Sequence, residues 1–198
     1  MSELEVQAFV ERGDAHGATK LIIETYGVEV FGYVTSLLKD EDLASDAFSA
    51  ACENVFKAVT AFRGQSSVRT WFYTIARHAA FREARQQRRR RGEPISMLEG
   101  DLAAPIRTAT AAFRKTEIKD KVAQLRESLS AEERELLLLR IDRGLSWNEI
   151  AAVCLGAETA PAEAELKLEA ARCRKQFERA KAKLRKLAEQ AGLLPSKD

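Results

Sequence analysis

Apolar residues recur at every third or fourth position along most of this chain, and this spacing constrains its fold more than any other feature. In the first half, such stripes run from Leu21 to Leu38 and from Leu43 to Val59. Side chains with this period lie on one face of an α-helix, which has about 3.6 residues per turn. Glycine and proline, which interrupt helices, number only 10 and 4 in 198 residues. The sequence therefore predicts an all-α protein.

A third apolar stripe begins at Val68, after a predicted loop at residues 62–65. Ser66 or Ser67 can cap this third helix, because a serine hydroxyl accepts a hydrogen bond from the free backbone N–H groups of a first turn. We therefore expect three helices in the first half of the chain.

The third helix also carries a concentrated block of positive charge. Residues 61–91 contain nine arginines and a single acid, whereas the whole chain has a net charge of only +2. Trp71 and Phe72 lie on the apolar stripe and are expected in the core, while Tyr73 lies off it. Aromatic rings and arginines on one helix suit unpaired bases and their phosphates, although a solvated helix face also has this pattern. His78 is interpreted as a polar-face residue, not a metal ligand or a catalytic base.

The helical pattern is interrupted in the middle of the chain. Residues 92–112 contain two glycines and two prolines, which disfavour a long helix. We expect a linker there, between a first helical domain at 1–91 and a second at 113–198. The helical pattern returns around Phe113.

The second half of the chain contains two capping boxes, each at the expected start of a helix. Ser130 and Ser146 are each followed three residues later by a glutamate, and in this motif each side chain bonds to the other's backbone N–H. Gly144 and Gly156 can end the two helices in left-handed caps. Two short helices with a tight glycine turn predict a helix-turn-helix, the scaffold of many duplex-DNA readers.

An unusually long last helix is predicted after these two. Apolar residues alternate in steps of three and four from Leu166 to Ala191. Residues 171–198 carry nine bases and three acids. With the arginines at 61–91, the chain has two basic blocks on separate helical units, which suggests two contacts with one polyanion.

Several function classes are disfavoured. Cys52, Cys154 and Cys173 have neither disulfide-frame nor zinc-site spacing, so we expect buried thiols in a reducing cytoplasm. We see no phosphate-binding glycine loop, metal cluster or nucleophile–base set, and therefore expect no enzyme activity, cofactor, metal or small-molecule substrate. We expect no apolar run to approach membrane-spanning length, and the N-terminus lacks a signal-peptide layout. The sequence predicts a cytoplasmic protein.

The order of these pieces resembles that of bacterial RNA polymerase sigma factors of the sigma-70 family, of the small extracytoplasmic-function (ECF) type. FRGQSSVRTWFYTIARHAA is similar to the loop and tryptophan-containing helix of that family's first domain. LRESLSAEERELLLLRIDRGLSWNEIAAVCLG and the closing FERAKAKLRKL are similar to its second domain and the basic helix that follows. The resemblance implies transcription initiation as the function. It also implies three partners, which are core RNA polymerase, promoter DNA and an anti-sigma protein.

The resemblance also implies sites. The first domain is expected to dock on the polymerase clamp through Asp42, Asp46, Ser49 and Glu53. It is expected to melt the promoter −10 element and hold non-template bases through Arg63, Gly64, Gln65, Ser66, Arg69, Tyr73, Arg77, His78, Arg82 and Arg85. The candidates for reading the −35 element as duplex are Arg172, Arg174, Lys175, Gln176, Arg179 and Lys183. The linker 92–112 is expected near the polymerase active-site channel.

Three features depart from the family's pattern. Ser49 and Ala50 stand where Gln-Glu or Gln-Asp is usual, and His78 stands where Asn is common. AETAPAEAELKLE separates Gly156 from the basic stretch, so either the last helix is lengthened at its N-terminus or an extra turn is inserted.

Stacking on an aromatic side chain contributes roughly 1–3 kcal/mol per base, and unstacking a flipped base costs a few kcal/mol. The isolated protein is therefore expected to bind duplex promoter weakly and to open it only with polymerase. Two other functions stay open. One is a polymerase-independent helix-turn-helix regulator, which needs only residues 113–198, and the other is a helical adaptor that binds another protein.

Overall fold

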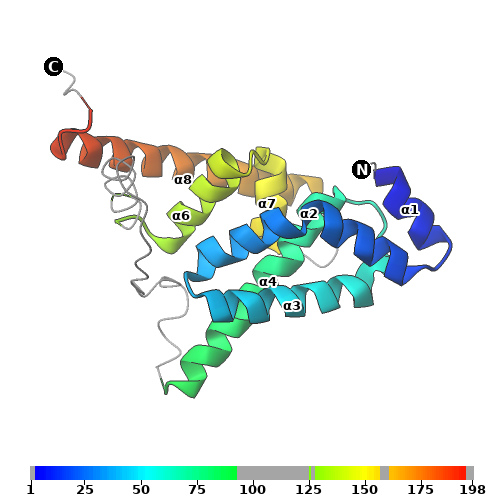
Figure 1. Ribbon diagram of the computed structural model, residues 1–198. Helices are drawn as coiled ribbons and strands as arrows, with labels where there is room; N and C mark the ends of the chain where they lie inside the picture. Colours follow the sequence, from blue (N-terminus) through cyan, green and yellow to red (C-terminus); the bar gives the residue numbers. More distant parts are fainter. Residues whose placement is uncertain (1–2, 93–124, 126–127, 157–160, 195–198) are drawn as a thin grey trace.

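The computed structural model describes residues 3–92, 125, 128–156 and 161–194, and the regular structure in these ranges is entirely helical (Figure 1). This confirms the predicted all-α class. Apart from Gly92, the expected linker lies outside the described residues, as does the expected helical start at Phe113. In chain order the elements are α1 (Glu3–Glu11), α2 (Ala15–Leu38), α3 (Glu41–Ala58), the 3₁₀ turn η1 (Val59–Ala61), α4 (Val68–Arg90), α6 (Ala131–Leu137), the π-helical turn η3 (Leu138–Asp142), α7 (Trp147–Leu155) and α8 (Glu163–Gln190).

Helices α1 to α4 form what we call the first unit; α1 is an addition to the three helices expected from the sequence, and the other three begin at well-formed caps. Asp14, Asp40 and Ser67 each accept a hydrogen bond from the backbone N–H three residues later, at 2.8, 2.9 and 3.0 Å. These bonds satisfy donors that the first turn of a helix leaves unpaired. Lys39 adopts a left-handed backbone with φ 55° and ends α2. The chain then reverses, and α3 packs along α2 (Figure 1).

Helix α2 is the central helix of the first unit. It is long and apolar enough to cross a membrane by length and composition alone. The expectation that no apolar run reaches this length is therefore wrong for Ala15–Leu38. Nine of its residues are buried, and it packs against α1, α3 and α4. Burial inside the helical bundle thus accounts for part of its apolar composition, while Val28 and Phe31 stay exposed.

Helices α6 to α8, the second unit, contain both predicted capping boxes. Ser130 and Glu133 exchange bonds of 2.8 and 3.2 Å, and Ser146 and Glu149 exchange bonds of 2.7 and 3.3 Å. Gly156 ends α7 with φ 62°, a left-handed conformation that glycine adopts without strain. The predicted starts of both helices and the predicted end of α7 therefore have the expected chemistry, whereas α6 ends at Leu137 and passes into η3 before Gly144.

Helix α8 is continuous from Glu163 to Gln190. Of the two alternatives for the inserted residues, the structure shows a last helix lengthened at its N-terminus, while residues 157–160 lie outside the described ranges. Its apolar face packs on α6 and α7. Trp147 of α7 meets Phe177 of α8 edge to face, with ring centroids 5.2 Å apart.

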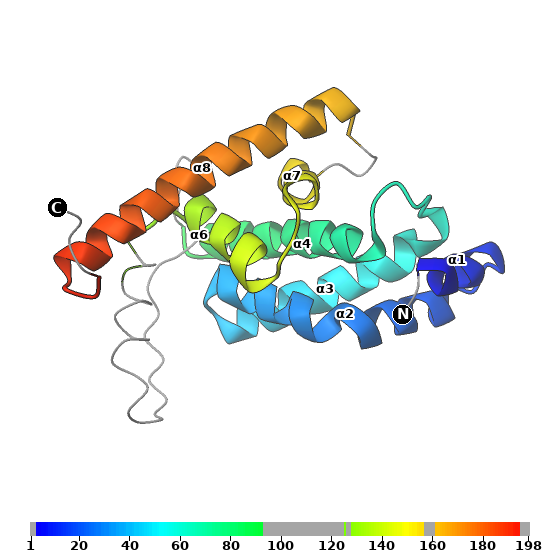
Figure 2. The ribbon, with the colours of Figure 1, turned by 90° about the horizontal axis from the view of Figure 1, so that it is seen from above.

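The two units pack against each other. Their buried residues form one continuous apolar cluster, from Val6 to Ala180. Figure 2 shows α7 between α8 and α4, and α4 contacts α7 as well as α2 and α3. The second unit therefore covers one side of the helix that carries the predicted strand-binding arginines.

Candidate nucleic-acid interface

The structure divides the predicted strand-binding residues of α4 into two groups. Toward the N-terminus, Arg69, Tyr73, Arg77 and His78 are partly or fully buried. The C-terminal end of α4, which carries the remaining arginines, extends past the rest of the first unit (Figure 1). Those that are exposed are Arg82, Arg85, Arg89, Arg90 and Arg91. Only the second group is open to solvent in this arrangement.

Arg77 is held by an acid of the second unit. Its Nε donates to Oε1 of Glu135 on α6 at 2.8 Å, and the Tyr33 hydroxyl of α2 donates to the same oxygen at 2.6 Å. The Glu135 side chain is only 4% exposed. Burial lowers the pKa of Arg77, but the carboxylate of Glu135 more than offsets this, so the net pKa is raised. Burial, and then the charge of Glu135, raises the pKa of Tyr33.

Arg69 makes a second connection between the units. Its guanidinium forms a two-bond pair with Glu29 on α2, at 2.7 and 3.0 Å. The same group donates to the backbone carbonyl of Arg143 at 2.7 Å, just beyond η3. The Arg143 side chain in turn lies against Gly32, where an added Cβ would sit 2.8 Å from its Nη2. These three bonds use the donors of Nε and Nη2, so only the two N–H groups of Nη1 are left for a phosphate.

The aromatic and imidazole groups of α4 are also covered. Tyr73 is fully buried, with its ring 5.1 Å from that of Tyr33, so the expectation that it lies away from the core is wrong. The reason is that α4 also packs on α2, where the Tyr73 ring meets that of Tyr33. Burial, and then the charge of Glu29, raises the pKa of Tyr73 to about 12. His78 lies against Gly156, where any side chain would collide with the imidazole.

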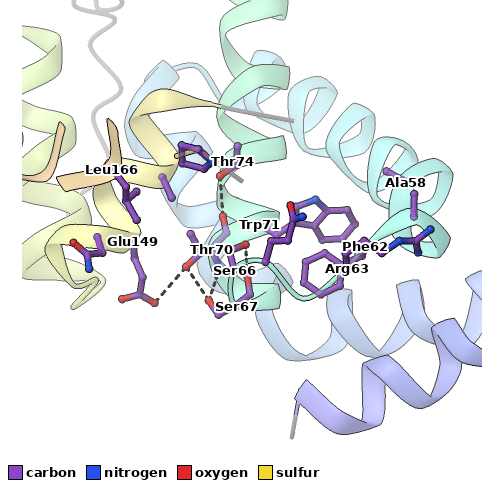
Figure 3. A pocket seen from close by; sticks show the side chains of 15 residues that line it. Ala58, Phe62, Arg63, Ser66, Ser67, Thr70, Trp71, Thr74, Glu149 and Leu166 are labelled. Carbon is purple, nitrogen blue, oxygen red and sulfur yellow. Dashed lines mark hydrogen bonds between the residues drawn. The ribbon is translucent and has the colours of Figure 1, made fainter. Parts of the chain in front are cut away.

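The loop before α4 lines a cavity of about 460 Å³ between the two units (Figure 3). Its first-unit wall includes Arg63, Gln65 and Ser66. The rings of Trp71 and Phe62 also line it, tilted to each other with centroids 4.9 Å apart. The opposite wall comes from α7 and the start of α8. Figure 3 shows the Thr70 hydroxyl pointing at Glu149 across the cavity edge, at 3.3 Å. Gly64 beside it has a φ of 69°, which favours glycine.

Helix α8 presents most of its predicted duplex-reading residues to solvent. Arg172, Arg174, Lys175 and Arg179 are exposed. The other two candidates are engaged by the second unit itself. Gln176 donates to Glu132 at 2.8 Å, and Lys183 donates to the Ser128 carbonyl at 2.8 Å. The exposed group therefore forms the open basic face of α8.

The predicted polymerase-binding residues share one exposed face of α3. Asp42, Asp46, Ser49 and Glu53 are all exposed, at the three- and four-residue steps that keep side chains on one side of a helix. Phe56, 48% exposed, continues this face. Sequence reasoning missed Phe56 because it was assigned to the apolar stripe.

Sequence reasoning also missed the residues that cover α4. Glu135, Glu29 and Glu149 bind its side chains, yet none was a candidate. One signal was present for Glu135, an acid directly before the run Leu136–Leu139. An acid in a run that packs into a core needs a partner there.

Comparison with known proteins places this chain in a family. Residues 22–90 match the family model described as "Sigma-70 region 2". The chain is 31% identical to the RNA polymerase sigma-H factor of Pseudomonas aeruginosa over 151 residues, which cover 73% of this chain and 78% of that protein.

Two further relatives carry ECF in their names. The chain is 28% identical to the ECF RNA polymerase sigma-E factor of Escherichia coli over 151 residues, with coverage of 73% and 78%. It is 24% identical to the ECF RNA polymerase sigma factor SigX of Bacillus subtilis over 136 residues, with coverage of 67% and 70%. The similarity extends beyond the region 2 match, over about two thirds of the chain or more.

Proposed function

We propose, from the premise that this chain belongs to the extracytoplasmic-function sigma factors of the sigma-70 family, that its two units recognise the two elements of a promoter. Members of the family are specificity factors of transcription initiation and not enzymes. In this chain, α4 and the loop before it capture the −10 strand, α8 reads the −35 duplex, and α3 docks on core RNA polymerase. The protein acts in the cytoplasm, and an anti-sigma protein is its proposed inhibitor.

The observation that carries the proposal is the pair of separate basic helices. α4 ends in exposed arginines, and α8 presents Arg172, Lys175 and Arg179 to solvent. Phosphate contacts from such residues give affinity and register, while one or two base-edge contacts give sequence choice. Two basic faces on separate units suit one DNA that is single-stranded at one contact and duplex at the other.

Strand capture is assigned to the cavity wall at 63–66 and to the covered arginines. Trp71, which is half-buried, offers ring surface there, in place of the buried Tyr73. Arg69 and Arg77 lie next along α4, and each is already bonded within the protein. We infer that the second unit must leave α4 before Arg77 contacts DNA, whereas Arg69 is also paired with Glu29 of the first unit.

The covering of α4 changes the apparent affinity of the free protein for the −10 strand. If only a fraction of the molecules has α4 uncovered, the apparent dissociation constant for the −10 strand is the intrinsic constant divided by that fraction. Covering α4 thus lowers the affinity of the free protein for DNA. Core polymerase, by holding the two units apart on its surface, would remove this penalty. The proposed order is polymerase docking first and strand capture second.

Duplex reading is assigned to the open face of α8, which needs no such opening. The N-terminal extension of α8 bears Glu163 and Glu165, and their charge disfavours a close approach to phosphate. We therefore place the base contacts from Arg172 onward and not in the extension. Lys183 and Gln176 serve to hold α8 on α6.

Run-off transcription with bacterial core RNA polymerase, on a library of upstream fragments, tests the proposal. We expect promoter-specific products that require the protein, and co-purification of the protein with core polymerase. Absence of both results would overturn it. Specific duplex binding without polymerase association would favour the helix-turn-helix regulator, and no DNA binding at low salt would favour the adaptor.

A further inference from the structure

The interface between α7 and α8 holds two of the three cysteines of the chain. Cys173 on α8 is buried, with 2% of its surface exposed, and Cys154 near the end of α7 is partly buried against the same core. Trp147, seven residues before Cys154, contacts Phe177, four residues after Cys173. Residues spaced by four or seven share one face of a helix. The two cysteines therefore lie on the faces by which α7 and α8 pack.

The two side chains are close enough to interact, and a hydrogen bond from the Cys154 S–H to the Cys173 sulfur accounts for opposite shifts of their pKa values. This bond, with burial, raises the pKa of Cys154, and the same bond lowers the pKa of Cys173. Glu169, whose Oε1 lies 3.7 Å from the Cys173 sulfur, opposes the second effect. Within the pair, Cys173 is thus the group that holds a thiolate more readily.

We propose that Cys154 and Cys173 form a reversible intramolecular disulfide when the folded protein meets a small hydroperoxide. The Cys173 thiolate attacks the O–O bond of hydrogen peroxide, gains one oxygen as a sulfenic acid and releases hydroxide, which takes up the proton that Cys173 gave up. Cys154 then attacks the sulfenic sulfur, the S–O bond breaks, and the Cys154 proton leaves with the oxygen as water. Two thiols are oxidised by two electrons in total, and one peroxide becomes two waters.

The geometry also predicts which oxidants act. Because Cys173 is almost fully shielded, hydrogen peroxide is expected to react faster than a bulky disulfide such as oxidised glutathione. The S–S bond would fix the end of α7 to α8 between Arg172 and Arg174, within the open basic face. It needs no separation of helices, because α7 and α8 already pack together.

Cys52 is a built-in control. It lies on α3 in the first unit, is half-buried, and has a pKa that burial raises. The experiment treats the full folded chain with hydrogen peroxide, unfolds it, alkylates the remaining thiols and maps the peptides by mass spectrometry. We expect one linked peptide pair that contains Cys154 and Cys173, loss of two hydrogens per chain, free Cys52, and full reversal by dithiothreitol.

Serine substitutions of the three cysteines test the proposal further. Cys154→Ser and Cys173→Ser should each abolish the linked peptides, whereas Cys52→Ser should leave them unchanged. Linkage through Cys52, linkage between chains, sulfinic acid without a crosslink, or crosslinking only in urea would each overturn the proposal. The peptide map of the unaltered chain tests the proposal even if one variant fails to fold. A negative result leaves the sigma-factor proposal untouched, because no step of promoter recognition depends on the disulfide.

Discussion

Arg77 of α4 and Glu135 of α6 form a nearly buried ion pair, with 2.8 Å between Nε and Oε1. Their side chains are 18% and 4% exposed. The same guanidinium reaches the carbonyl of Cys154 on α7 at 3.4 Å. Arg77 is thus joined to two elements of the second unit, and a DNA phosphate can bind it only after the Glu135 carboxylate has left.

Replacing Glu135 by glutamine removes the charge that holds Arg77 while keeping the size of the side chain. Breaking a buried ion pair at one partner typically costs about 3–5 kcal/mol, because the other charge stays buried and unpaired. We expect this cost to favour separation of the units, so that a single-stranded −10 oligonucleotide binds the free protein at least several-fold more tightly. Fluorescence anisotropy of a labelled oligonucleotide measures this.

Glu132→Gln is the matched control, since Glu132 is on the same helix but contacts Gln176 within the second unit. It should leave oligonucleotide affinity unchanged. Equal affinities of Glu135→Gln and the unaltered chain would show that the ion pair does not limit access to α4.

Tyr33→Phe removes the hydroxyl that donates to Glu135 at 2.6 Å. A hydrogen bond to a charged group contributes about 1.5–3 kcal/mol, and the variant leaves the carboxylate with one donor fewer. We expect the free energy of unfolding to fall by roughly that amount. Urea denaturation followed by circular dichroism measures this change in the free energy of unfolding. An unchanged midpoint and slope would argue that the two units are not packed as described.

The buried phenols predict a loss of stability in alkali. The pKa of Tyr73 is raised to about 12 in the folded chain, whereas an unfolded tyrosine titrates near pH 10. Between these values the folded chain holds a proton that the unfolded chain releases. The contribution of Tyr73 is therefore complete below pH 10 and is lost as the pH rises toward 12.

Tyr73→Phe removes this titration. Its free energy of unfolding should decline less steeply above pH 10 than that of the unaltered chain, by an amount on the order of 1–3 kcal/mol across the window. Below pH 9, the difference between the two proteins should not change with pH. A difference that is flat through pH 11 would contradict the burial of this phenol.

Variants of Arg179 and Lys183 distinguish the contribution of α8 to DNA binding from its packing in the second unit. Arg179 is exposed, whereas Lys183 is bonded to the Ser128 carbonyl and lies 3.6 Å from Glu133. Arg179→Ala is expected to weaken −35 duplex binding by about 1–3 kcal/mol if it contacts a base, or to flatten the salt dependence if it contacts a phosphate.

Lys183→Ala should change duplex affinity little, despite the removal of the same charge. Titrations at several salt concentrations, read together with the melting temperature, distinguish the two residues. A larger loss of affinity from Lys183→Ala than from Arg179→Ala would reverse the assignment of the open face.

Local structure could be predicted from the sequence where a short-range pattern determines it. The cap at Ser67, both capping boxes and the left-handed end at Gly156 all depend on residues within a few positions of each other. The apolar spacing predicted the helices for the same reason, since it reflects one helix face at a time.

The covering of α4 could not be predicted in this way. Arg77 and Glu135 are 58 residues apart, and Arg69 and Glu29 are 40 apart. An arginine buried by an ion pair has the same sequence signature as one in solvent. Tyr73 was misplaced for a related reason, because α4 has two buried faces and only the first is apolar throughout.

The proposed capture of promoter DNA depends most on one motion, the separation of α4 from the second unit. Spin labels at Ser45 on α3 and Glu178 on α8, both exposed, would report it by pulsed electron resonance in a chain whose three cysteines are serine. We predict a single short distance distribution in the free protein and a clearly longer one in the complex with core polymerase and promoter. The same short distribution in a transcribing complex would contradict the account.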